Sequence, residues 1–115
     1  MTDRDAEGDG VRDRASGPGV RLLDRVRRAV RLRHLSTSTE KAYVHWVKRF
    51  VLFHHRRPPW EMGEPEVREF LTHLAVRANV AASTQNQALA GLLFLYDKVL
   101  ERPLQDIGSV VRAKR

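Results

Sequence analysis

The sequence of 115 residues contains no cysteine, which excludes a disulfide scaffold, a cysteine-ligated zinc site and a thiol nucleophile. It also contains no apolar run approaching the roughly 20 residues that a membrane-spanning helix needs. Residues 1–19 include no apolar segment of the kind that forms a signal peptide. These absences predict a soluble, cytoplasmic protein that has no membrane partner.

Signatures of catalysis are also missing. The sequence has no glycine-rich phosphate loop and no Gly-x-Ser-x-Gly elbow. Its five histidines do not pair at i, i+4 with a carboxylate, as a metal site on a helix requires. Tyr43 and Tyr96 fall on apolar stripes, where core packing is a far simpler role than that of a nucleophile. We therefore expect no active site, no metal and no cofactor in this chain.

Positive charge is the property that the sequence has in excess, and it is unevenly distributed. The formal net charge is +7. Residues 20–57 carry a net charge of +9 and residues 102–115 carry +3, whereas residues 1–19 and 58–101 carry −2 and −3. Such a concentration of one sign indicates a polyanionic partner, most often a nucleic acid. A basic face that binds an acidic partner protein is the main alternative.

The spacing of apolar residues predicts an all-α fold, because they recur at three- and four-residue intervals and no strand pattern is present. Residues 1–19 have almost no large apolar groups and are expected to form a disordered tail. The predicted helices span about residues 20–33, 37–55, 64 onwards and 83–100. We expect them to pack as a compact four-helix bundle over residues 20–108, with residues 109–115 beginning a linker.

Several residues are expected to begin helices or to fill the core. Thr37 and Glu40 have the spacing of a capping box, and Ser83 is a plausible N-cap for the last helix. Leu93 is predicted to be buried in that helix. Gly91 lies in the middle of the same helix, where glycine costs up to about 1 kcal/mol relative to alanine. A close crossing of two helices at Gly91 would compensate for this cost.

The predicted helix 37–55 has one apolar half and one basic half. Its polar half includes Lys41, His45, Lys48 and Arg49. Such a face binds the phosphates of DNA in some proteins, although it is more often simply solvated. The residues at the start of the helix are Ser36, Thr37 and Ser38. They lie where free backbone N–H groups bind phosphate, and helix capping alone is the alternative.

The last predicted helix opens with polar residues, among them Thr84, Gln85 and Gln87. Amide side chains can make paired hydrogen bonds to adenine, so these residues are candidates for base recognition, with an unliganded polar helix end as the alternative. Gln85 lies nearer to the apolar stripe, which leaves a structural role open for it. The C-terminal cations are Arg112, Lys114 and Arg115, which either follow a DNA backbone or are ordinary terminal charges.

Three segments, in their order and spacing, resemble one protein family. Residues 38–50 (STEKAYVHWVKRF), 67–76 (VREFLTHLAV) and 80–96 (VAASTQNQALAGLLFLY) are similar to the N-terminal core-binding domain of integron integrases, which are tyrosine recombinases. The closing residues VVRAKR are similar as well. The resemblance covers roughly residues 20–115.

The resemblance implies a helical, SAM-like domain that binds DNA as one half of a clamp. It implies that the helix after Ser36 and the start of the last helix approach DNA. The implied partners are double-stranded DNA, the catalytic domain of a full-length recombinase and other recombinase protomers on the recombination site. The family's catalytic residues belong to the other domain and have no matching positions here. An unrelated helix-turn-helix regulator is disfavoured, because the connection from Pro58 to Gly63 is long.

Overall fold

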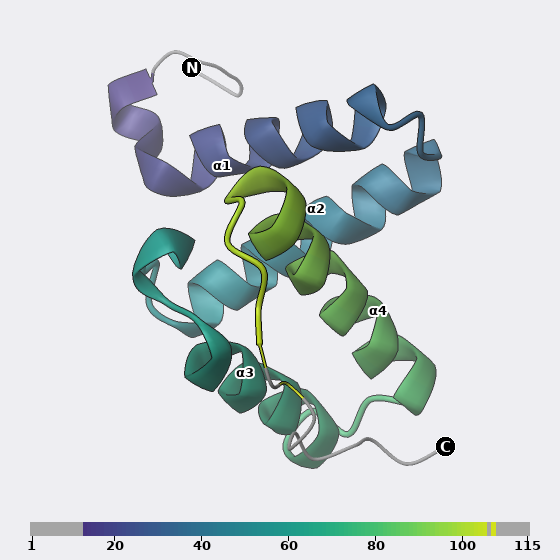
Figure 1. The fold of residues 1–115 in the computed structure, drawn as a ribbon. Helices are drawn as coiled ribbons and strands as arrows, with labels where there is room; N and C mark the ends of the chain where they lie inside the picture. The colour runs from purple at the N-terminus through teal and green to yellow at the C-terminus, as the bar shows by residue number, and fades with distance from the viewer. Residues whose placement is uncertain (1–12, 106, 108–115) are drawn as a thin grey trace.

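Four α-helices make up the fold in the computed structural model, which describes residues 13–105 and 107, with side chains from residue 21 onwards. They are α1 (Asp13–Leu32), α2 (Thr37–Phe53), α3 (Glu64–Val76) and α4 (Ala82–Phe94) (Figure 1). A 3-10 turn, η1 (Pro59–Glu61), precedes α3, and a π-helical turn, η2 (Leu95–Val99), continues α4. No strand occurs among these residues, so the prediction of an all-α fold is confirmed.

The helix α1 begins at Asp13, earlier than the start predicted at Val20. The prediction followed the apolar stripe, whose first buried member is Leu22, and backbone hydrogen bonding continues the helix beyond that stripe. Residues 1–12 of the expected tail lie outside the described residues. The same applies to the predicted linker 109–115, including its cations Arg112, Lys114 and Arg115.

Two predicted helix caps are wrong. Ser36, not Thr37, caps α2, because the Ser36 hydroxyl accepts a hydrogen bond of 3.0 Å from the backbone N–H of Thr39. Glu40 does not turn back to the start of α2 but pairs with an arginine of α1. A guanidinium offers two parallel, charge-assisted hydrogen bonds, which are stronger than one bond to a backbone N–H. The cap of α4 is Ala81, which has no side-chain hydrogen bond, and Ser83 lies inside the helix.

The core lies where α2, α3, α4 and η2 meet, and α1 covers one side of it. Phe50, Phe70 and Tyr96 are fully buried there. The Phe50 ring centroid lies 5.7 Å from that of Phe70 and 6.4 Å from that of Tyr96, and both pairs meet edge to face. The stripe predicted for α3 is buried as expected, and its members are Val67, Phe70, Leu71 and Leu74.

The helices α2 and α4 cross closely at Gly91, as the mid-helix glycine predicted. A Cβ atom on Gly91 would lie 3.5 Å from the Cα of Tyr43 and 3.5 Å from the Cβ of Trp46. The predicted burial of Leu93 is wrong, because this side chain is 40% exposed whereas that of Leu92 is fully buried. The apolar segment of α4 extends almost all round the helix, so the sequence does not reveal which of two adjacent leucines faces the core.

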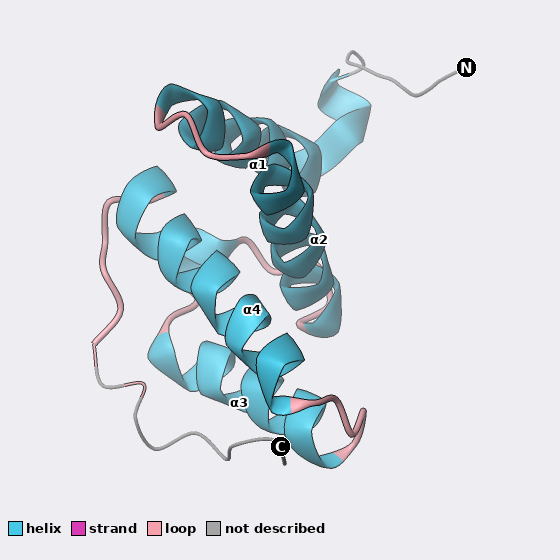
Figure 2. Ribbon diagram, turned by 90° about the vertical axis from the view of Figure 1, so that its right-hand side faces the viewer, coloured by secondary structure: helices cyan, strands magenta, loops and turns pink. Residues whose placement is uncertain are grey.

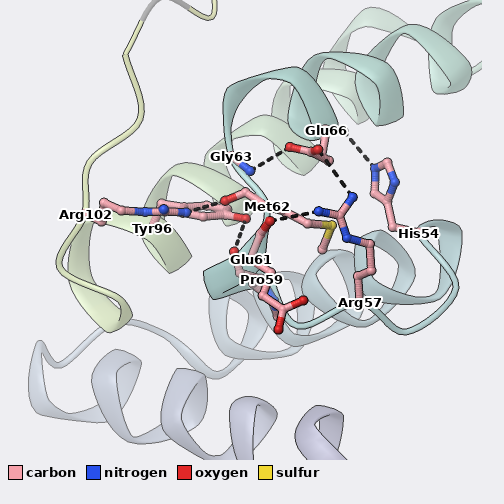
Figure 3. A network of polar contacts seen from close by, with 9 residues as sticks. All are labelled: His54, Arg57, Pro59, Glu61, Met62, Gly63, Glu66, Tyr96 and Arg102. Atoms are coloured by element: carbon pink, nitrogen blue, oxygen red, sulfur yellow. Dashed lines mark hydrogen bonds and ion pairs between the residues drawn. The ribbon is translucent and has the colours of Figure 1, made fainter.

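The chain after η2 turns back along the bundle and is fastened to the start of α3 (Figure 3). The guanidinium of Arg102 lies over the ring of Tyr96, 5.5 Å from its centroid, and donates a hydrogen bond to the carbonyl oxygen of Met62. The backbone N–H of Gln105 donates to the Glu64 carboxylate at 2.6 Å, and this bond lowers the pKa of Glu64. These contacts fix the direction in which residues 102–105 leave the bundle.

Candidate nucleic-acid interface

The basic face predicted for α2 is present and exposed to solvent. The exposed side chains are Lys41, His45, Lys48 and Arg49, and they follow one another at intervals of four, three and one residues. Among the described residues, neither Lys41 nor Lys48 forms an ion pair with a carboxylate. The positive charges on this face therefore remain available to an anionic ligand.

The aromatic ring of Trp46 supports two members of the basic face. The Arg49 guanidinium lies 5.2 Å from the ring centroid, within the range of a cation–π interaction. The His45 ring meets Trp46 edge to face, with 4.8 Å between centroids. Because Trp46 itself is buried beneath them, both side chains are held against α2. Less conformational entropy is lost when a side chain that is already ordered binds a ligand.

The start of α2 combines a cap with exposed hydroxyl groups. Ser36, Thr37 and Ser38 are all exposed. The Ser36 hydroxyl is engaged, since it accepts from the Thr39 N–H and donates to the Thr39 hydroxyl at 3.0 Å. The capping role of Ser36 is thus visible in the structure, and phosphate binding by these three residues stays a prediction.

The polar opening of α4 divides into structural and exposed residues. Gln85 is only 1% exposed, and its amide Nε2 donates a hydrogen bond of 3.0 Å to the carbonyl oxygen of Leu71 on α3. Gln85 is thus engaged within the fold, which favours the structural role left open for it, and a contact of Gln85 with a base stays a prediction. Gln87 is exposed and Thr84 is half-buried, so both stay candidates for a ligand contact.

The N-terminal ends of α2 and α4 lie on the same side of the molecule. The N-terminal ends of both helices are at the right-hand side of Figure 1. The loops before α2 and before α4 both face the viewer in Figure 2, which shows that side directly. The start of α2, with its hydroxyl groups, and the start of α4, with Thr84 and Gln87, thus share one side of the molecule but lie at its upper and lower ends in Figure 2.

Sequence reasoning missed an electrostatic cluster at the junction of α1 and α2. Arg31 donates two hydrogen bonds of 3.0 Å to the two carboxylate oxygens of Glu40. This pairing holds the pKa of Glu40 below its ordinary value, with further contributions from Arg27 and Lys41. The spacing of Glu40 after Thr37 suggested only a cap. The sequence contained no direct signal that its partner stands nine residues earlier on another helix.

Other polar groups of the domain serve the fold. The Tyr96 hydroxyl donates a hydrogen bond of 2.8 Å to the carbonyl oxygen of Pro59, and burial raises the pKa of Tyr96 (Figure 3). Tyr43 packs against Phe94, with 5.0 Å between the ring centroids. Both tyrosines therefore have the packing role that the sequence predicted. Among residues 13–105 and 107, no three histidine, cysteine, aspartate or glutamate side chains gather as metal ligands.

Within residues 13–105 and 107, no helix is long and apolar enough to cross a membrane.

Residues 22–106 match the family described as "Phage integrase, N-terminal SAM-like domain". Two curated relatives, from Escherichia coli and Pseudomonas aeruginosa, each carry the name "Integrase/recombinase". Each is 50% identical to the chain over 99 residues, which are 84% of this chain and 29% of the relative. The chain therefore spans less than a third of the length of these two relatives.

Proposed function

The chain belongs to the phage integrase N-terminal SAM-like domain family, and we propose that it is the DNA-binding domain of a site-specific recombinase. In this role it holds the recombination-site duplex as one half of a clamp. The catalytic groups belong to a separate domain, so the helical domain itself does not cleave DNA. Its partners are double-stranded DNA, that catalytic domain and other recombinase protomers on the same site.

The observation that carries this proposal is the one-sided basic face of α2. At 1.5 Å per residue, the stripe from Lys41 to Arg49 is about 12 Å long. The major groove of B-DNA is about 12 Å wide, so cations at the two ends of the stripe match phosphates on either side of the groove. Lys41 and Lys48 need not break an ion pair before they bind a phosphate.

We further infer that the recombinase is of the integron-integrase type. The segments STEKAYVHWVKRF and VAASTQNQALAGLLFLY, which form most of α2 and α4, support this narrower assignment. The two relatives named "Integrase/recombinase" agree with the broader class. Binding to a duplex that carries an integron recombination site, compared with a scrambled duplex, tests the narrower assignment.

Fluorescence anisotropy over a salt series tests DNA binding by the α2 face. Lys41→Ala, Lys48→Ala and Arg49→Ala should weaken binding to cognate and scrambled duplexes alike. Each phosphate contact that is removed should flatten the log–log salt slope by about one unit. Lys98→Ala is the control, because Lys98 is an exposed cation of η2, which continues α4 at the end away from its polar opening, and it pairs with Asp97 at 3.3 Å. This control should bind like the wild type.

Base recognition by α4 has a different signature. Gln87→Ala or Thr84→Ala should change discrimination between the two duplexes by about 1–3 kcal/mol if a paired base contact is lost. Absence of salt-dependent binding to any duplex at low ionic strength would reject the DNA-binding proposal. The basic face would then fit the alternative role, a module that binds an acidic protein.

A further inference from the structure

A shallow groove of about 390 Å³ lies on α1, and none of the residues that the sequence suggested for DNA binding lines it. Its lining residues are Asp24, Arg27, Arg28, Arg31 and Leu32. Three guanidinium groups thus surround the groove together with one carboxylate. That carboxylate, Asp24, is already paired with Arg27 at 2.8 Å. Arg28 is exposed and forms no ion pair within the described part of the chain.

The groove is continuous with the basic face of α2 through one ion pair. Arg31 lines the groove and reaches across to Glu40 on α2, where the Nη2–Oε2 distance is 3.0 Å. Lys41, the first cation of the α2 face, directly follows Glu40 in the sequence. Arg27, Arg31 and Lys41 all act electrostatically on Glu40, so cations of both helices lie near this carboxylate at the junction of α1 and α2.

Glu40 limits how readily an anion can bind to Arg31. Its side chain is 16% exposed, whereas that of Arg31 is 70% exposed, so the guanidinium is the accessible partner. A phosphate that approaches Arg31 must compete with the Glu40 carboxylate, which occupies two of its donors. The pair lies at the surface, and exposed ion pairs are weak, so such competition is feasible.

We propose that the α1 groove is a second phosphate-binding site, which extends the DNA contact of α2 onto α1, and that Glu40 limits its affinity by holding Arg31. This inference rests on the proposed function and names a further part of the same interface. A duplex that lies along the α2 face would continue over the junction with α1. Arg28 would then contact the backbone directly, and Arg31 would exchange Glu40 for a phosphate.

A nucleic-acid backbone fits this groove better than an acidic protein for one structural reason. The groove is not an isolated patch, because Arg31 and Glu40 connect it to Lys41 on the face already proposed for DNA. Leu32 at its edge is 69% exposed and offers a small apolar surface to the sugar of a nucleotide. An acidic protein partner is kept as an outcome of the experiment.

The test uses three variants of the chain in duplex-binding titrations over a salt series. Arg28→Ala should weaken binding to cognate and scrambled duplexes and flatten the log–log salt slope by about one unit. Arg28→Lys, which keeps the charge, should retain most of the wild-type slope. Glu40→Gln should strengthen binding at low salt by about two- to fivefold, because Arg31 is released. Urea midpoints within error of the wild type would show that the three variants are folded.

A matched control separates the release of Arg31 in Glu40→Gln from the mere loss of one negative charge. Glu69→Gln changes the formal charge by the same amount on an exposed position of α3. Binding by this variant should change much less than binding by Glu40→Gln. Equal strengthening by the two variants would overturn the role of Glu40.

The outcomes also distinguish this inference from the proposed function. If Lys48→Ala weakens binding but Arg28→Ala and Glu40→Gln match the wild type, the α1 site is wrong and DNA binding by α2 stands. If no duplex is bound, both proposals fail. If poly-glutamate displaces the duplex from wild type but not from Arg28→Ala at equal ionic strength, the groove selects acidic polypeptide, and the proposal is overturned.

Discussion

The adjacent residues Leu92 and Leu93 offer a direct test of the orientation of α4. The Leu92 side chain is fully buried and the Leu93 side chain is 40% exposed. Truncation of a fully buried leucine removes its transfer free energy and leaves a cavity, so Leu92→Ala should cost about 2–5 kcal/mol. Leu93 borders an open groove with Tyr43 and Leu104, and its truncation should cost about 1 kcal/mol.

Urea unfolding followed by circular dichroism measures both values, provided that the slope of the free energy with denaturant stays constant. For a domain of this size, each 1 kcal/mol lowers the melting temperature by about 4–8 °C, so a thermal scan also resolves the pair. The wild type and Leu93→Met serve as controls, since methionine keeps the volume of the side chain. If Leu93→Ala lowered the free energy of unfolding as much as Leu92→Ala or more, the assignment of Leu92 to the buried face of α4 would be refuted.

Three further predictions follow from buried or charged contacts. Gln85→Ala should lower the free energy of unfolding by about 1–3 kcal/mol, because the buried hydrogen bond from the Gln85 amide to the Leu71 carbonyl oxygen is lost. Gln87→Ala should change it by under about 0.5 kcal/mol in the same urea assay. Gly91→Ala should melt near the wild type, because its Cβ meets α2 at 3.5 Å, but Gly91→Leu should lose about 1–3 kcal/mol through overpacking. Stability should hold from pH 7 to about 5 and fall below pH 4.5, because the pKa values of Glu40, Glu64 and Glu66 in the folded chain lie under their ordinary 4.5. The Gln105 N–H is the main cause for Glu64, so Glu64→Gln should flatten part of that loss in acid titrations of the urea midpoint.

The class of the fold could be predicted from the sequence because its core positions are periodic. The buried residues of α3 repeat at the spacing of one helix face, and the polar residues between them leave no ambiguity. Gly91 predicted a close crossing of two helices, since such a crossing would compensate for the cost of a glycine inside an apolar helix. In both cases the signal is local and the tertiary structure agrees with it.

Predictions failed where a residue had a partner on another helix. Glu40 has the right spacing for a local cap, but Arg31 of α1 offers it a stronger interaction. For Gln85 the sequence left base recognition and a structural role both open, and only the fold shows that its amide binds a carbonyl of α3. Leu93 was assigned to the core because α4 is apolar on nearly every side, and only packing against α2 and α3 selects its buried face.

The part of the candidate interface that depends on a local pattern could be predicted, and the part that depends on the fold could not. The exposure of Lys41 and Lys48 follows from the helical wheel of α2 alone, since apolar residues define the opposite face. The groove of α1 could not be predicted, because arginines surround almost the whole polar side of that helix. Only the fold shows which of them gather in a groove and which bind backbone carbonyl groups.

This division among the arginines sets the salt dependence expected for DNA binding. Arg25 donates to the carbonyl oxygen of Val99 at 2.9 Å, and Arg33 donates to that of Ala29 at 3.1 Å. Arg57 likewise donates to the Glu61 carbonyl oxygen at 2.9 Å and pairs with Glu66. These three side chains contribute to the net charge of +9 of residues 20–57 but are committed to the fold.

The number of phosphate contacts should therefore be well below the number of cations. The proposed contacts are those of Lys41, Lys48 and Arg49 on α2 and of Arg28 and Arg31 on α1, which makes five, and the log–log slope for binding should be about −4.5. A slope near −10 would mean that most cations of the segment bind phosphate, including those now bonded to carbonyl groups. Arg25→Ala decides between the two cases: it should lower the melting temperature and leave the slope unchanged if its role is structural, whereas a flatter slope at unchanged stability would place Arg25 on the DNA.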